Sequence, residues 1–563
     1  MNKDETILEF DFTSENKFKK IFTSFIVFVS LILFFIVLSS YKNPTYRVNN
    51  KLVHINTHQF QNLLEKQINL VCDTIVDDSI HNINNELNIL LVKFYEDREY
   101  KPAWIHNLAT NHQFSIFINL LDSAHYYGFP VDYFNIEEIH SLNNDFFSTA
   151  NNKDLLHQRI KLELTTTFSA LKYISYLKHG IIERDTSLVY QVDISEISEI
   201  LNNAINQNNL RNEILSVQPN LVHHRNLLNS LSYFIDLHYS VKYTTPAFID
   251  DKLLAKSLYY AGITKSPVFD STNLKASALY KLQDDYNLRN DSILNVPTHE
   301  ILVSLLKFKY FQACLNLNRL RSLKHSGENY LFVNIPEFKL HVIESDEEKE
   351  TFNVIVGKEK TPTPVLSSSI EKVIANPYWT VPKSITFEML HKIRRDSTYL
   401  KRNGFFVINN YEEVVDASTI DWNKKDPLGN KYWLRQINSS SNALGQVKFI
   451  FPNNFSVYLH DTPSKSLFSR ENRTFSHGCV RLENPDKLAQ YLTDNYSQQR
   501  DSSIEKLISE NERQEIDLTE KIKIHIQYIT CSGSNNSDIV FFNDIYNLDT
   551  EEIKAIFLNQ IEI

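Results

Sequence analysis

The sequence has little glycine, little cysteine and no excess of positive charge. Of its 563 residues, 10 are glycine and 4 are cysteine, and the formal net charge is −10 at pH 7. No two cysteines form a Cys-x-x-Cys pair, which excludes a zinc ribbon and a thioredoxin-like motif. The negative charge, without a Lys/Arg cluster beyond the N-terminal segment, argues against nucleic-acid binding. Sparse glycine suits long helices, and the length suits about two to four domains.

One long apolar run, Ile21–Leu38, lies near the N-terminus and carries no charge. At about 1.5 Å per residue, a helix over this run nears the thickness of a bilayer core. A cleaved signal peptide has a shorter apolar core and a small-residue cleavage site, for which residues 38–41 are only a weak match. We therefore predict a cytoplasmic tail over residues 1–20 and a retained transmembrane anchor over residues 21–40, with a signal peptide as the alternative.

The remaining chain separates into a helical part and a strand-rich part. Apolar residues recur at helical spacing after residue 85, as at Leu87, Leu90, Leu91 and Phe94. From Tyr330 onwards the apolar positions alternate with a period of two, which is typical of strands. The predicted divisions are a polar tether with a short helix over 41–84, a helical scaffold domain over 85–245, a small helical module over 246–325, and a mostly β domain over 328–563 with an insertion over 377–428.

The segment that indicates chemistry is Ser476-His477-Gly478-Cys479, with a second histidine, His460, upstream in a strand-like stretch. A cysteine needs a base to become a thiolate near neutral pH, because its free pKa is about 8.5. A histidine supplies such a base, and Gly478 lets the backbone approach a substrate carbonyl without a side chain in the way. These residues predict an acyl-transfer enzyme that works through a thioester on Cys479.

The order of the motifs resembles the L,D-transpeptidases, whose catalytic unit is the YkuD domain, and in particular their long, membrane-anchored, YcbB-like branch. The resemblance rests on Ser476-His477-Gly478-Cys479 and on segments at 333–336, 356–358, 376–382, 442–445 and 459–463, with a scaffold-like stretch from Phe94 to Trp104. It implies an α+β multidomain protein with a C-terminal β-sandwich, in which 377–428 caps the active site. Residues 246–325 resemble the peptidoglycan-binding repeat of that branch, with a simple helical spacer as the alternative.

The residues and the resemblance together predict a role for each site residue. Cys479 is the nucleophile, His460 the proton donor and acceptor, and His477 a supporting residue, although an exchange of roles between the two histidines stays open. Backbone N–H groups of Gly478 and Cys479 form the oxyanion hole, and Asp461 or a nearby carbonyl orients His460. The predicted substrate-binding residues are Arg481, Ser476, Tyr378 and Trp379, although Arg481 could equally brace its loop through Glu483.

The implied reaction is the formation of 3→3 cross-links between peptidoglycan stem tetrapeptides, with release of the terminal D-alanine and no cofactor or metal. The resemblance further implies a carbapenem-sensitive thiol, a single-pass inner-membrane location with the catalytic domain in the periplasm, and other cell-wall enzymes as possible partners. Water as acceptor gives a carboxypeptidase, and a lipoprotein amine gives an anchoring enzyme. A cysteine endopeptidase, a non-catalytic wall-binding scaffold and a zinc site formed by His460, His477 and Cys479 remain alternatives.

Overall fold

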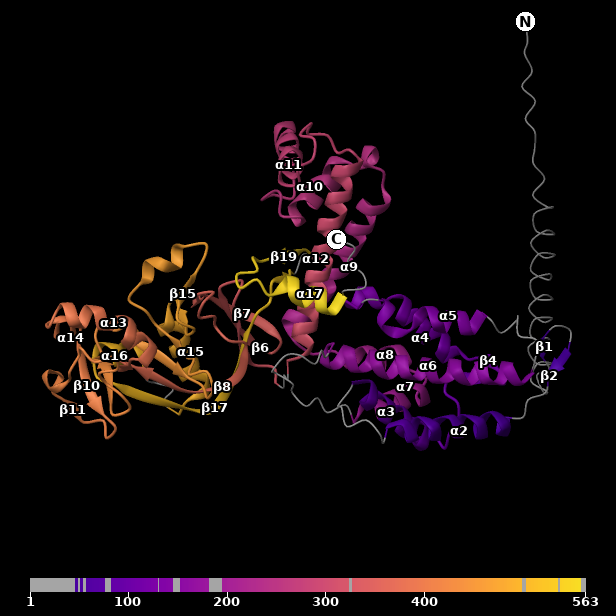
Figure 1. Ribbon diagram of the computed structural model, residues 1–563, viewed down its shortest axis with the longest axis horizontal. Coiled ribbons are helices and arrows are strands. Elements are labelled where there is room, and N and C mark those ends of the chain that lie inside the picture. Colours follow the sequence, from indigo (N-terminus) through magenta and orange to yellow (C-terminus); the bar gives the residue numbers. More distant parts are fainter. Residues whose placement is uncertain are drawn as a thin grey trace, which may run out of the picture. The chain divides into compact units, whose positions relative to one another are not determined.

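The computed structural model describes residues 46–48, 51–53, 57–75, 83–129, 131–144, 152–181, 195–323, 327–498, 503–534 and 537–557 (Figure 1). The described residues form two compact units. The first takes in the chain up to residue 122 together with 132–174 and 193–214, and the second takes in 123–131, 175–192 and 215–563.

The first unit is helical. Its helices are α2 (Thr57–Ile75), α3 (Ile83–Asp97), α4 (His112–Asp122), α5 (Ile136–Asn144), α6 (Asn152–His179), α7 (Ile197–Asn206) and α8 (Leu210–Ser216). Two short antiparallel pairs accompany them, β1 (Tyr46–Val48) with β2 (Lys51–Val53) and β3 (Ile105–His106) with β4 (Ala109–Thr110).

A buried tryptophan and a buried carboxylate hold the centre of this unit. The Trp104 ring stacks on Phe117 with centroids 5.4 Å apart, and its indole N–H donates to Thr167 Oγ1 at 2.8 Å. The Glu163 carboxylate accepts from the Tyr95 hydroxyl at 3.0 Å and from the Trp104 N–H at 3.1 Å. Burial raises the pKa of Glu163 to about 7. These bonds satisfy polar groups that water cannot reach, so the stretch leading to Trp104 is part of the core.

The location predicted from the apolar N-terminal run needs correction. Among the residues that the structure describes, no helix has both the length and the apolar composition to cross a membrane. This finding overturns the predicted single-pass inner-membrane location; the predicted tail and anchor, residues 1–40, lie outside the described residues. The predicted tether over 41–84 contains α2, which at 19 residues is longer than the short helix expected there.

Four helices precede the strands of the second unit, and polar side chains cap the N-termini of three of them. The four helices are α9 (Val222–Tyr243), α10 (Asp251–Tyr260), α11 (Thr272–Asp285) and α12 (Val296–Arg321). The residues before α10, α11 and α12 are Asp250, Ser271 and Asn295, and each accepts a hydrogen bond from a backbone N–H of the first turn. Such caps satisfy N–H groups that have no partner within the helix. Cys314 is fully buried on α12.

A nine-stranded sheet forms the body of the second unit, in the order β15-β7-β16-β14-β13-β8-β17-β5-β6. The strands are β5 (Tyr330–Asn334), β6 (Lys339–Glu344), β7 (Glu347–Gly357), β8 (Leu366–Ala375), β13 (Val447–Ile450), β14 (Leu459–His460), β15 (Thr474–Ser476), β16 (Val480–Leu482) and β17 (Gln514–Gln527).

Strand β7 closes this sheet on itself because it changes partner along its length. Its first part pairs with β6 from Glu347 to Asn353, and its last residues pair with β16 and β15. Register shifts interrupt the β6–β7 and β8–β17 pairings. Such irregularities bend strands and let a sheet close. The enclosed core is aliphatic and aromatic, with Leu459, Val480, Phe449 and Val354 among its fully buried members.

A second, four-stranded sheet has a hydrophobic core of its own. Its order is β11-β10-β12-β9, with β9 (Trp379–Thr380), β10 (Phe405–Asn409), β11 (Val414–Val415) and β12 (Tyr432–Gln436). Helices α13 (Lys383–Arg395) and α14 (Tyr399–Arg402) join it, and Met389, Leu390 and Leu434 are among the core residues. This body reaches eight residues beyond the predicted insertion over 377–428, because β12 pairs with both β9 and β10.

The charge pattern of residues 501–516 favours a helix over this stretch. The structure has only the short helix α16 (Ile504–Ser509) there, and β17 already begins at Gln514. The remaining elements are α15 (Pro485–Tyr496), the pair β18 (Cys531–Gly533) and β19 (Ile539–Phe541), and α17 (Asp549–Phe557).

Candidate active site

The strand register brings three polar side chains into one row across the nine-stranded sheet. His460 on β14 is paired with Lys448 on β13 and with Arg481 on β16. Directly paired residues project from the same face of a sheet. Their neighbours Phe449, Leu459 and Val480 are fully buried in the core, so the row faces away from it.

Cys479 and Tyr458 lie on the same face, each two residues before a member of the row. The N–H of Val480 donates to the Tyr458 carbonyl at 3.2 Å, which extends the β14–β16 alignment back to this level. The Tyr458 ring meets His460 edge to face, with centroids 5.5 Å apart, and Lys448 Nζ lies 3.8 Å from the Tyr458 ring centroid. The predicted nucleophile and both predicted partners, His460 and Arg481, are therefore brought to one surface.

The turn that carries the cysteine is closed by Ser476. Its hydroxyl donates to the Cys479 carbonyl at 2.6 Å and accepts from the Gly478 N–H at 3.1 Å. Gly478 has φ +116, a conformation that side chains other than glycine's rarely adopt, and its carbonyl accepts from Thr363 Oγ1 at 2.9 Å. Ser476 was predicted to bind substrate; in the structure its hydroxyl bonds to the backbone of Gly478 and Cys479.

The orientation of His460 follows from its backbone partner. Its Nδ1 contacts the Asp461 carbonyl oxygen, which only accepts, so Nδ1 carries the proton and Nε2 is the basic nitrogen. Burial, aided by the positive charges of Arg481 and Lys448, lowers the pKa of His460 to about 3. The imidazole is therefore neutral around pH 7, the state that a general base requires.

The carboxylate of Asp461 is engaged by the neighbouring loop. It accepts from the Gln446 N–H at 2.8 Å and the Thr462 N–H at 2.6 Å, and it pairs with Lys465. Gly445, at φ +60, packs so closely that a Cβ there would lie 2.2 Å from Asp461 Oδ2. Of the two orienting groups left open by the sequence, the Asp461 carbonyl is the one that accepts a hydrogen bond from His460.

The environment of Cys479 mixes an apolar setting with positive charge. Burial raises the pKa of the Cys479 thiol, and hydrogen bonding from Tyr458 together with the charges of Lys448 and Arg481 acts in the opposite direction. The thiol donates to the Ser456 carbonyl at 3.9 Å. At rest the site thus holds a protonated thiol and a neutral histidine on one face of the sheet, with two cations whose charges favour the thiolate.

The other predicted residues are less closely grouped. His477 is partly exposed and its Nε2 lies 3.3 Å from the Glu388 carboxylate on α13. Trp379 on β9 forms a side-chain hydrogen bond with Tyr458. The Nε of Arg481 is buried without a hydrogen-bond partner in the structure, whereas Glu483 accepts from Asn353. The Tyr378 side chain is 40 % exposed.

Sequence reasoning missed Lys448 and Tyr458. Tyr458 had an available signal, because a residue two positions before a strand histidine shares its face. Lys448 had none, since only the pairing of β13 with β14 places it beside His460.

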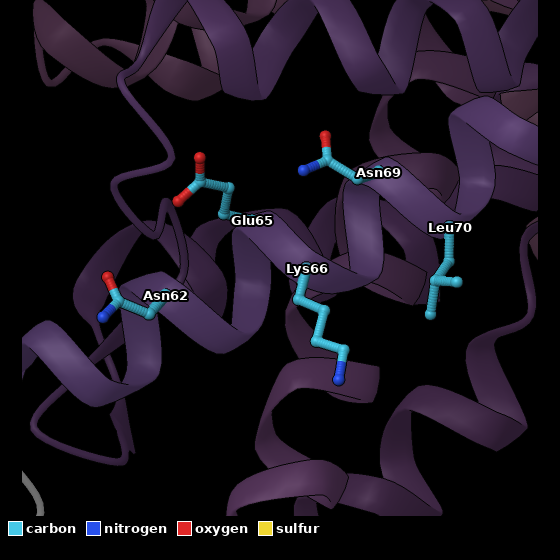
Figure 2. A pocket seen from close by; sticks show the side chains of 5 residues that line it. All are labelled: Asn62, Glu65, Lys66, Asn69 and Leu70. Carbon is cyan, nitrogen blue, oxygen red and sulfur yellow. The ribbon is translucent and has the colours of Figure 1, made fainter.

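A shallow depression elsewhere is lined by Asn62, Glu65, Lys66, Asn69 and Leu70, all from α2 (Figure 2). It contains none of the predicted site residues. The side chains in Figure 2 point in different directions along one helix, so they do not converge on a common point.

Comparison with known proteins finds two matching families and one similar curated protein. Residues 328–501 match the L,D-transpeptidase catalytic domain, YkuD, and residues 90–231 match a family described as a scaffold domain. A Haemophilus influenzae protein named "Putative L,D-transpeptidase" is 34% identical over 244 residues, which are 42% of this chain and 48% of that protein. The chain thus spans about half the length of this relative.

Residues 328–501 are therefore similar to the YkuD-type L,D-transpeptidase catalytic domain, as the sequence resemblance indicated. The motif that carries Cys479 and the strand that carries His460 both fall inside the matched range.

Proposed function

We propose that this protein is an L,D-transpeptidase that forms 3→3 cross-links between peptidoglycan stem peptides through a thioester on Cys479. The observation that supports it most is the strand register, which aligns His460 with Arg481 and so puts the base and the thiol of Cys479 on one face of adjacent strands. The match of residues 328–501 to the catalytic domain supports the same class of reaction.

In the first step, Nε2 of His460 takes the thiol proton while the sulfur attacks the carbonyl of the third residue of a stem tetrapeptide. The amide bond to the terminal D-alanine breaks, His460 gives the proton to the departing amine, and the acyl group stays on Cys479 as a thioester. Lys448 and Arg481 stabilise the transient thiolate by charge.

The oxyanion that forms in this step needs backbone donors, each contributing about 3 kcal/mol. The N–H of Gly478 already donates to Ser476 Oγ. We therefore assign the first oxyanion contact to the N–H of Cys479, with Gly478 joining when the Ser476 hydroxyl turns away.

In the second step, the side-chain amine of a neighbouring stem's third residue attacks the thioester. A new C–N bond forms, the C–S bond breaks, and the amine's proton returns through His460 to the sulfur of Cys479. One amide replaces another, so the exchange needs no nucleotide, cofactor or metal. Water in place of the amine would give a carboxypeptidase.

The four-stranded sheet is proposed to cap this site. Its helix α13 reaches His477 through Glu388 at 3.3 Å, and its strand β9 reaches Tyr458 through Trp379. A cover of this kind excludes water, which would otherwise hydrolyse the thioester. Glu388→Gln should raise the ratio of hydrolysis to transfer, measured on one muropeptide mixture. An unchanged ratio would leave the cap without a protective role.

The decisive experiment incubates the full chain with purified tetrapeptide muropeptides and follows the products by mass spectrometry. We expect cross-linked dimers with loss of D-alanine, and neither product with Cys479→Ala. The matched control is Cys531→Ala, a free cysteine outside the site, which should keep both products.

Other outcomes separate the alternatives. Shortened peptides without dimers would indicate a carboxypeptidase, and cleavage of added dimers an endopeptidase. Retention on peptidoglycan without turnover, and without acylation of Cys479 by a carbapenem, would indicate a non-catalytic scaffold.

A further inference from the structure

A second cluster of chemically competent side chains lies in the second unit, at the β6–β7 hairpin and the start of α9. His223, His341 and Glu348 each present one ligand atom, and these atoms all lie within 4.8 Å of one another. His223 is the second residue of α9, His341 is on β6 and Glu348 is on β7. None of the three belongs to the motifs that carry the proposed transpeptidase chemistry.

His341 is held between two carboxylates. Its Nδ1 lies 2.8 Å from Glu348 Oε2, and its Nε2 lies 3.0 Å from Glu337 Oε2. Carboxylates only accept, so both ring nitrogens donate and each carboxylate fixes one of them. A metal-binding histidine characteristically gives one nitrogen to the ion and donates the other N–H to a carboxylate. Glu337 supplies that carboxylate on the Nε2 side, which leaves Nδ1 directed at the cluster.

His223 has a nitrogen without a partner in the structure. Its Nδ1 is buried and makes no hydrogen bond. The ring is fixed, because it stacks on Phe332 with centroids 4.0 Å apart and meets the His341 ring edge to face at 5.0 Å. A buried polar atom without a partner is unfavourable and calls for an explanation. A ligand that accepts the Nδ1 lone pair would remove the deficit.

The charges and donor types select one class of ligand. Glu337 and Glu348 carry two negative charges around two imidazoles, so a divalent cation that replaces one proton would neutralise the cluster. Two nitrogen donors and one carboxylate oxygen suit Zn²⁺, whereas Ca²⁺ and Mg²⁺ prefer oxygen donors throughout.

We propose that His223, His341 and Glu348 bind a Zn²⁺ ion, with Glu337 orienting His341 from behind. Binding through Nδ1 of His341 releases the proton that this nitrogen shares with Glu348, and the Nε2 proton stays with Glu337. Three protein ligands leave the fourth tetrahedral position to a water molecule. The ion joins the first turn of α9 to the β6–β7 hairpin and so fixes the strand that continues towards the Cys479 turn. This inference does not depend on the proposed transpeptidase activity.

The test measures zinc binding by the untagged full chain after treatment with EDTA. Equilibrium dialysis against Zn²⁺, with the metal counted by mass spectrometry, should give one tightly bound ion per chain. Because a thiol is a potential zinc ligand, the same measurement is made on Cys479→Ser, which should again give one ion. Co²⁺ in place of Zn²⁺ should give tetrahedral absorption bands without the charge-transfer band of a sulfur ligand.

Two variants remove ligands with little risk to folding. His223→Phe keeps the ring stacking on Phe332 and loses both nitrogens, and Glu348→Gln changes a side chain that is 47% exposed. Each should weaken zinc binding by about tenfold or more. Zinc should raise the melting temperature of the wild type and raise it less in either variant. His238→Gln, on the same helix but outside the cluster, is the matched control and should bind zinc like the wild type.

The outcomes decide the proposal. One ion per chain that is lost in His223→Phe and kept in Cys479→Ser supports it. Absence of tight zinc binding, equal affinity in His223→Phe and the wild type, or loss of the ion in Cys479→Ser would each overturn it.

Discussion

Replacing Gly445 by alanine should disturb the hydrogen bonds that hold Asp461 beside His460. The expected loss in the free energy of unfolding follows from the contacts of Gly445. A Cβ at Gly445 would lie 2.2 Å from Asp461 Oδ2 and 2.3 Å from its Cγ, closer than atoms pack. The carboxylate must therefore move, which breaks a hydrogen bond from Gln446 or Thr462. Holding alanine at φ +60 costs about 1–2 kcal/mol, and a lost hydrogen bond to a buried charge costs about 1.5–3 kcal/mol. We expect a total loss of about 2.5–5 kcal/mol in the free energy of unfolding.

The variant Gly429→Ala measures the cost of holding alanine at positive φ without a steric clash. Gly429 has φ +50 in the same unit, and a Cβ there would have no neighbour within 4 Å. Urea unfolding of both variants, followed by circular dichroism, should show Gly429→Ala losing only about 1–2 kcal/mol. Gly445→Ala should also release D-alanine more slowly, since the Asp461 carbonyl that orients His460 moves with its side chain. Equal losses of stability in the two variants would refute the reasoning.

Three further predictions concern charge and protonation. Lys448→Met removes a cation that favours the Cys479 thiolate, so the pH of half-maximal labelling by iodoacetamide should rise by about one unit; an unmoved profile would contradict this. His460→Gln should slow D-alanine release by about 10²–10⁴-fold and His477→Gln by less than about tenfold, and the reverse order would exchange their roles. Two carboxylates raise the pKa of His341 from 6.5 to about 9. The stabilisation that protonated His341 gives the folded protein is therefore complete below pH 6.5 and is lost as the pH rises through 9. Urea unfolding of EDTA-treated protein should show a loss of up to about 3 kcal/mol over this range, and a flat profile would contradict the prediction.

The sequence was most informative where the relevant contacts are local. Ser476 to Cys479 lie within four residues, and the hydroxyl of the first closes the turn that presents the last. The helical first part and the strand-rich last part also followed from periodicity. A row such as Lys448, His460 and Arg481 depends on pairings between strands distant in the sequence, and hydrophobic pattern does not specify which strands are neighbours.

Element boundaries and long-range contacts were hard to predict for the same reason. Residues 514–516, at the end of the charged stretch expected to be helical, instead pair with the end of β8, ahead of a register shift between Asp517 and Ile522. Glu388 and His477 are 89 positions apart, and neither shows a pattern that would link them. Tertiary pairing overrides local preference at such places.

The closure of the nine-stranded sheet through β7 has a consequence for how the protein behaves at high concentration. An open sheet presents rows of free N–H and C=O groups, which invite a strand of another molecule and so promote aggregation. Here β6, the last strand in the order, is paired on both sides, and at the other end stands only the three-residue β15. Within the described part of this sheet, long strands therefore offer little free backbone for intermolecular pairing.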